Sequence, residues 1–147
     1  MGNIADELTT SIQKTGARAT VSSKWNSQNV LKQLSTRFGI PGGRGELWEH
    51  LVDSVGHQDP NAWRWIAEFV RGQPCMLAMP PRLELAVFDF DDGAELVAVL
   101  ELCSGFEFYV TDKALSFVLC SNHHEYLIGA GAAVDWLRAR VKSHLSV

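Results

Sequence analysis

The spacing of the hydrophobic residues changes near residue 73, and this change constrains the fold more than any other feature of the sequence. Before that point apolar residues recur every three to four positions, which is the period of an amphipathic helix. After it they form short continuous or alternating runs separated by proline, glycine and aspartate, which is typical of strands. The pattern therefore predicts an α+β domain, with a helical N-terminal half packed on a sheet.

Four helices are expected in the first half, over residues 4–12, 30–38, 47–55 and 63–70. Their starts carry suitable residues, because Asn3 can cap the first helix, Ser27 lies near the start of the second, and Asp59-Pro60 can begin the fourth.

The stretch between the first two helices is polar and carries no clear period. Residues 1–24 are therefore expected to form a mobile or peripheral N-terminal segment. Nothing in the composition marks a boundary between domains, so residues 1–147 are expected to form a single α+β domain.

A mainly antiparallel, four-stranded sheet is expected in the second half, from residues 75–79, 83–90, 106–111 and 115–120. The turns are mostly too short for the crossover that a parallel pair needs. A C-terminal helix that begins near Ala132 closes the sheet.

The segment from residue 93 to residue 103 has two interpretations. Asp92-Gly93 between apolar runs is a hairpin signal, whereas Asp92 followed by Glu95 is typical of a helix N-terminus. Alternation along this segment is imperfect, so we favour the helix.

The charge balance excludes two classes of partner. The chain has 13 Lys and Arg residues against 17 Asp and Glu residues, a formal net charge of −4. Nucleic acids and anionic membranes attract clustered positive charge, so we expect neither as a partner. We expect a monomer or a weak homodimer.

The cysteines and the apolar runs bear on localisation. Cys75, Cys103 and Cys120 lie in apolar stretches without metal-ligand spacing, so they are expected to be buried, reduced thiols. No apolar run has the length of a membrane span and no signal region is recognisable. We therefore expect a cytoplasmic protein.

Two polar segments could carry chemistry. Asp89 and Asp91 end a predicted strand, a pattern that resembles the nucleophile motif of haloacid-dehalogenase-type phosphatases. However, the residue after Asp91 is Asp92 rather than glycine, and the segment also lacks the ligand spacing of a calcium loop. A polar strand end that runs into a helix cap is the simpler interpretation.

The second segment is His123-His124-Glu125. His123 and Glu125 match half of the zinc-deaminase signature, but no cysteine follows Cys120 to complete it. Adjacent residues of an extended segment point to opposite faces, so His123 and His124 are not expected to share an ion. We expect no metal and no cofactor. A small hydrolase or metal-dependent enzyme that uses Asp89, Asp91, His123, His124 and Glu125 remains the alternative function.

The C-terminal part resembles a known family. It contains Phe106-Glu107-Phe108-Tyr109, then Asn122-His123-His124, then Gly129-x-Gly131 and Trp136-Leu137. This pattern, which covers about residues 93 to 140, resembles a family of small bacterial proteins similar to SUKH-like immunity proteins of polymorphic toxin systems. The resemblance implies a protein that binds and neutralises a cognate toxin. An acidic chain suits such a role when the toxin is basic, because complementary charge speeds association.

A non-enzymatic protein-binding module is therefore the expected function. The partner surface is expected on the second hairpin and the segment after it, at Glu107, Tyr109, Asp112, His123, His124 and Glu125.

Strand parity decides which of these residues face outward. Glu107 and Tyr109 alternate with the more apolar set Phe106, Phe108 and Val110, which is expected to face the core. Glu107 and Tyr109 would then lie exposed on the outer face. The alternative is that Tyr109 packs under the last helix against Trp136.

Overall fold

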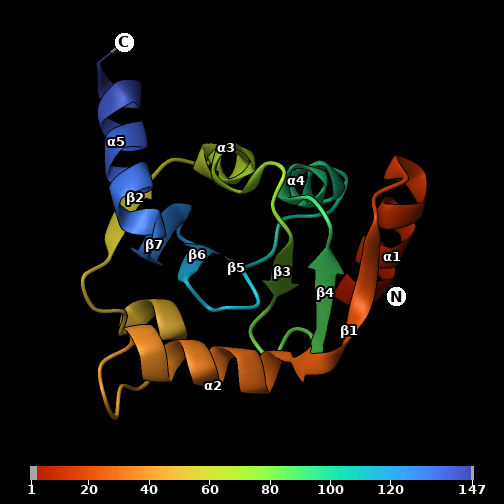
Figure 1. Cartoon of the computed structure of the whole chain (residues 1–147), viewed down its shortest axis with the longest axis horizontal. Helices are drawn as coiled ribbons and strands as arrows, with labels where there is room; N and C mark the ends of the chain where they lie inside the picture. Colours follow the sequence, from red (N-terminus) through yellow and green to blue (C-terminus); the bar gives the residue numbers. More distant parts are fainter. Residues whose placement is uncertain (1–2, 147) are drawn as a thin grey trace.

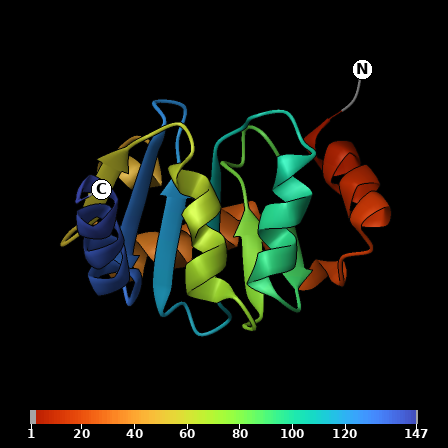
Figure 2. The same cartoon turned by 90° about the horizontal axis from the view of Figure 1, so that it is seen from above.

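Helices cover both faces of an antiparallel sheet in the computed structural model, which describes residues 3–146 (Figures 1 and 2). Within these residues the sheet has seven strands in the order β1-β4-β3-β5-β6-β7-β2, and every neighbouring pair is antiparallel. The strands are β1 (Ala19–Asn26), β2 (Val55–Gln58), β3 (Cys75–Ala78), β4 (Ala86–Phe90), β5 (Phe108–Thr111), β6 (Phe117–Ser121) and β7 (Tyr126–Gly131). The helices are α1 (Ile4–Thr15), α2 (Ser27–Phe38), α3 (Ile66–Val70), α4 (Gly93–Glu101) and α5 (Ala133–Leu145), with the 3-10 turns η1 (Leu47–Glu49) and η2 (Ala62–Trp65).

Each face of the sheet has its own hydrophobic core. On one face α1, α3, α4 and α5 pack over side chains such as Leu77, Phe88 and Val110. On the other face α2 and η1 pack over side chains that include Met76 and Tyr109. Because both faces are covered, the central strands are apolar at successive positions, and all four residues of β3 and of β5 are buried.

The structure confirms the α+β class, the antiparallel pairing and the helices at α1, α2, α4 and α5, but the predicted number of strands is wrong. The sheet gains β1, β7 and β2. Two of these, β1 and β2, are its edges, and edge strands carry the polar side chains that discourage pairing with other chains. Their sequences therefore lack the apolar pattern that reveals a central strand.

The N-terminal segment folds into α1 and β1, and β1 lies at one edge of the sheet, so the segment is peripheral but packed on the rest of the domain. Within residues 3–24, α1 packs on α4, where Leu8 is fully buried and the Ser11 hydroxyl donates to the carbonyl oxygen of Val99 at 2.6 Å. Ala19 then pairs with Phe90 at the start of β1. Residues 1–2 lie outside the described residues. The segment is thus an integral part of the fold.

The helix predicted over residues 47–55 is replaced by a single turn, η1. The chain folds back here, because the Val52 N–H donates to Phe38 O and the Ile40 N–H donates to His50 O, each at 2.8 Å. Asp53 then takes a left-handed conformation with φ of 50°, which ends any helix before β2 begins.

The helix interpretation of α4 is confirmed. The Asp92 carboxylate accepts hydrogen bonds from the N–H groups of Ala94 and Gly72, both at 2.9 Å, so it caps α4 and fixes the end of α3. Glu95 does not complete a capping box, since its carboxylate pairs with Arg18 at 2.8 Å. At Gly93 a Cβ atom would lie 2.7 Å from Val70 O, so glycine permits the close approach of α3 and α4.

Candidate functional site

A buried carboxylate organises the region where β5 begins and β6 ends. Glu107 is 4% exposed, and its Oε1 atom accepts a hydrogen bond from the His123 backbone N–H at 3.2 Å. The same oxygen lies 2.9 Å from His123 Nδ1. A carboxylate accepts hydrogen bonds, so His123 Nδ1 is the donor in this contact. The sequence prediction that Glu107 and His123 belong to one region is therefore consistent with this geometry.

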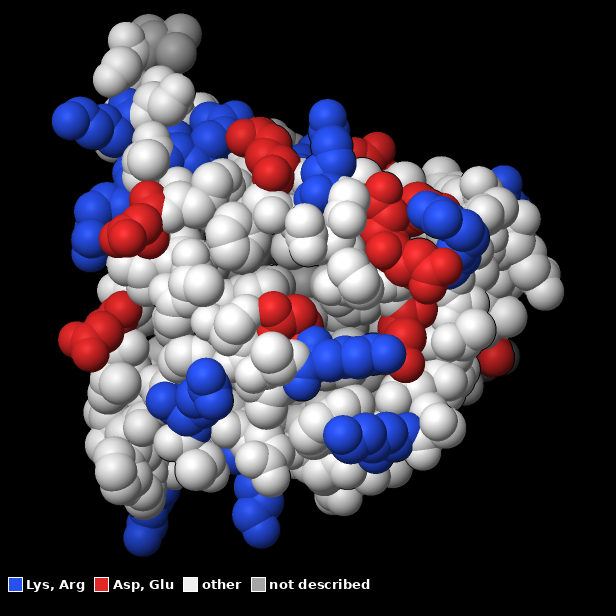
Figure 3. All heavy atoms as spheres, in the orientation of Figure 1, with Lys and Arg blue, Asp and Glu red and all other residues white. Residues whose placement is uncertain are grey.

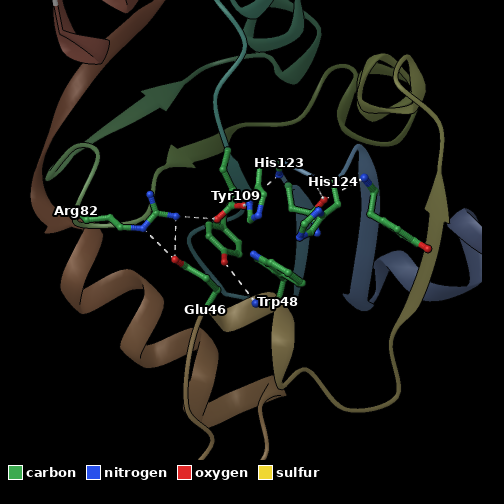
Figure 4. Close-up of polar contacts among 9 residues, drawn as sticks. Glu46, Trp48, Arg82, Tyr109, His123 and His124 are labelled. Carbon is green, nitrogen blue, oxygen red and sulfur yellow. Dashed lines mark hydrogen bonds and ion pairs between the residues drawn. The ribbon is translucent and has the colours of Figure 1, made fainter.

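A second acid and an arginine extend this contact (Figure 4). Arg82, from the β3–β4 connection, lies 2.8 Å from Glu46 and 3.6 Å from Glu107 Oε2. Arg82 is about half exposed, whereas the Glu107 side chain is 3% exposed. The charge of Glu107 is thus balanced by one half-exposed arginine that it shares with Glu46.

Aromatic rings cover the exposed side of this network. The indole of Trp48, in η1, makes edge contacts with the rings of His123 and His124, at centroid distances of 5.9 and 5.8 Å. The centroids of the two imidazole rings lie 4.0 Å apart (Figure 4). Both histidines are exposed. This arrangement fixes the loop between β6 and β7 against η1.

The predicted exposure of Glu107 and Tyr109 is wrong. Tyr109 is fully buried, and its hydroxyl accepts from the Trp48 backbone N–H at 3.4 Å. The predicted parity is right, since Phe108 and Val110 enter the other core, but α2 and η1 cover the face expected to be open. Tyr109 does not pack under the last helix either, because Trp136 belongs to the opposite core, where it contacts Phe69 at 5.1 Å.

Next to this network is an open groove of about 470 Å³, between η2, the end of α4 and the β6–β7 loop. Its lining combines four acids with four aromatic residues: Asp59, Glu101, Glu107 and Glu125, and Trp63, Phe106, Phe108 and Tyr126. Among its described lining residues, Arg64 is the only lysine or arginine. The groove is therefore acidic with apolar walls.

Arg64 shows how this lining holds a guanidinium group. Its side chain lies over the Trp63 ring at 4.7 Å and pairs with Glu101 at 3.3 Å, with both charged side chains about half exposed. A cation over an aromatic face and next to a carboxylate is stabilised by both groups.

The structure separates the other predicted residues. Glu125 lines the groove and His124 lies beside it, but Asp112 lies at the far end of β5. There its carboxylate accepts from the Ser116 N–H at 2.8 Å and closes the β5–β6 turn. Asp112 is therefore a turn residue, and its inclusion in one surface with His123 is wrong.

Asp89 and Asp91 lie at that far end too. Asp89 pairs with Met76, which pairs with Thr111 at the end of β5, whereas His123 bonds to Glu107 before β5 begins. Desolvation raises the pKa of Asp89, whose buried Oδ1 atom has no hydrogen-bond partner among the described residues. The five groups of the alternative enzyme do not converge.

The three cysteine thiols differ in their exposure to solvent. Cys75, Cys103 and Cys120 are all free, and burial raises the pKa of each, to about 12 for Cys75. Cys103 is partly exposed and lines the groove, whereas the other two are buried in the sheet.

The residues that sequence reasoning missed come from separate helices, turns and loops: Glu46, Trp48, Trp63, Arg64, Arg82 and Glu101. No shared spacing links them, so no sequence pattern could have found them together.

On the face viewed in Figure 3, acidic and basic side chains are interspersed, and the densest group of Lys and Arg side chains (blue) lies over α5.

One group of His, Cys, Asp and Glu side chains within residues 3–146 could hold a metal ion. His57, Asp59 and His144 have ligand atoms within 4.8 Å of one another. They are distinct from the adjacent pair His123 and His124.

Comparisons with family models, with curated proteins and with solved structures found no match for this chain. The resemblance to SUKH-like immunity proteins therefore stays a prediction. None of the helices in the described part of the chain is both long and apolar enough to cross a membrane.

Proposed function

We propose that this chain is a non-enzymatic protein-binding module whose groove accepts a basic, partly apolar segment of a partner protein. The observation that carries the proposal is the lining of the groove, in which four acids accompany four aromatic residues and a single arginine. A site of this composition favours arginine or lysine on an otherwise apolar segment.

The internal contact of Arg64 supports this choice of partner. Its guanidinium already lies between Trp63 and Glu101 at the groove wall. Glu125, exposed in the β6–β7 loop, supplies a further carboxylate that makes no ion pair among the described residues. A partner arginine can therefore gain a charge-assisted hydrogen bond without displacing Arg64.

A cognate toxin is the partner class that the SUKH-like resemblance implies, and a basic toxin matches the charge of the groove. Exposed side chains would extend the contact, since His123 and Tyr126 line the groove and His124 lies beside it. The hydrolase alternative is less well supported, because Asp89 and Asp91 lie at the opposite end of the strands from His123.

Selection from a displayed library of random hexapeptides tests the proposal. Wild-type protein should enrich peptides that combine arginine or lysine with apolar residues. The double variant Glu101→Gln, Glu125→Gln, which removes two groove charges, should lose this enrichment. Asp135→Asn is the matched control, because this acid on α5 has a 99% exposed side chain outside the groove. Equal enrichment on the double variant, or no cationic preference on wild type, contradicts the proposal.

A further inference from the structure

Three side chains with metal-binding atoms meet where the end of β2 lies against the last turn of α5. His57 is in β2, Asp59 follows that strand, and His144 is in α5. One ligand atom of each lies within 4.8 Å of the others. The fold thus brings together two imidazoles and a carboxylate from two regions of the chain that are far apart in sequence.

The carboxylate is already oriented. Asp59 Oδ1 accepts from the Asn61 N–H at 2.7 Å, which leaves Oδ2 directed at His144 Nε2, 3.4 Å away. Two ligands of one tetrahedral zinc ion, each about 2.0–2.1 Å from the metal, lie about 3.3 Å from one another. Asp59 and His144 therefore have the separation of a ligand pair, and the ligand atom of His57 lies within 4.8 Å of both.

The rings are held by a buried aromatic residue. His57 stacks on Trp65 with centroids 5.7 Å apart and an interplanar angle of 18°, and His144 lies 5.1 Å from the same indole. Arg140 also lies over Trp65, at 4.3 Å, but its charge pairs with Glu68 at 2.9 Å. The charge of Arg140 is therefore paired, and the two imidazoles pack on the buried Trp65 ring.

We propose that His57, Asp59 and His144 form a binding site for a divalent transition-metal ion of the zinc class. Neutral imidazole nitrogen and carboxylate oxygen are donors that zinc prefers, and three protein ligands leave one position for water or another ligand. The bound ion would link α5 to the end of the edge strand β2, because its ligands come from both regions. The site rests on residues other than the acids tested in the groove, so the two proposals can fail separately.

Titration of untagged, chelator-treated protein with Zn²⁺ and with Co²⁺ tests the site. We expect one equivalent of each ion to bind, and Co²⁺ to show the strong visible absorption of a four-coordinate complex. At a Zn²⁺ concentration of roughly 100 Kd the melting temperature should rise by about 5 °C or more. Mg²⁺ should produce no rise, because it prefers oxygen ligands.

Two ligand variants and one control variant test the assignment. His144→Ala removes an exposed side chain and Asp59→Asn preserves shape, so both should fold, and each should weaken Zn²⁺ binding by about 100-fold or more. His124→Ala is the control, since it removes an exposed histidine from a different cluster. The proposal is overturned if no saturable binding occurs, if His144→Ala binds like wild type, or if His124→Ala abolishes binding instead.

Discussion

Glu107 Oε1 lies 2.9 Å from His123 Nδ1, and this contact joins the buried start of β5 to the exposed loop after β6. The carboxylate also accepts from the His123 backbone, so one acid fixes both the ring and the main chain of the loop. Glu107 therefore holds in place a loop that lines the groove. This nearly buried side chain thus helps to set the shape of the groove surface.

Replacement of Glu107 by alanine should lower the free energy of unfolding by about 1–3 kcal/mol, because it removes hydrogen bonds that a buried side chain makes. Urea denaturation measures the effect. Glu101→Ala removes an exposed partner of Arg64 and should cost less than about 1 kcal/mol. Equal losses for the two variants would show that Glu107 is not a buried anchor.

Tyr109 should behave as a core residue. Tyr109→Ala empties a fully buried site and should cost about 3–5 kcal/mol, whereas Tyr109→Phe loses the weak bond to Trp48 and should cost about 1 kcal/mol. Thermal unfolding of both variants checks this order. A Tyr109→Ala protein of wild-type stability would place the side chain on the surface.

Asp92 should make the stability of α4 depend on pH. Hydrogen bonds from the Ala94 and Gly72 N–H groups lower its pKa. A carboxyl whose pKa is lowered in the folded state stabilises the fold above its unfolded pKa of about 3.9, and this contribution is lost as the pH falls through the folded pKa. Asp92→Ala should therefore cost about 0.5–2 kcal/mol at pH 7, and the difference from wild type should shrink below about pH 4. A constant difference from pH 7 to pH 3 would contradict this role.

Thiol labelling should distinguish the cysteines. In the native protein Cys103 should react first, slowly for a thiol because its pKa is raised, while Cys75 and Cys120 should react only on unfolding. Denatured, unreduced protein should give three thiols. Cys103→Ser should abolish native labelling, and a groove ligand should slow it. A denatured count of one would indicate a disulfide.

The elements that the sequence predicts well are those whose burial is visible in the local pattern. The central strands β3, β5 and β6 are continuous apolar runs because helices cover both faces of the sheet. The edge strands were missed because few of their side chains are buried, and Val21 in β1 is 58% exposed. At η1 a helical period arose because Leu47 enters the core while Leu51 bridges to Gly39.

The site was predictable only where it is local in sequence. Glu107, His123 and Glu125 were selected together because one hairpin and the following loop carry them. Asp112 was wrongly included, since a hairpin places its turn at the end opposite to its outer termini. Trp48 and Arg82 reach the site through tertiary packing, which no local spacing reports.

The claim that the groove binds a basic segment is tested most directly by chemical-shift titration of ¹⁵N-labelled protein with two matched peptides. Each is acetylated and amidated with leucine on both sides of the central residue, which is arginine in one and uncharged, isosteric citrulline in the other. We predict that the arginine peptide binds at least about tenfold more tightly than the citrulline peptide. The chemical-shift changes should cluster at groove amides such as Ser104, Phe106 and Glu125. The double variant Glu101→Gln, Glu125→Gln should remove the preference for arginine, while Asp135→Asn should not. Equal affinity for the two peptides, or shifts that cluster away from the groove, would contradict the account.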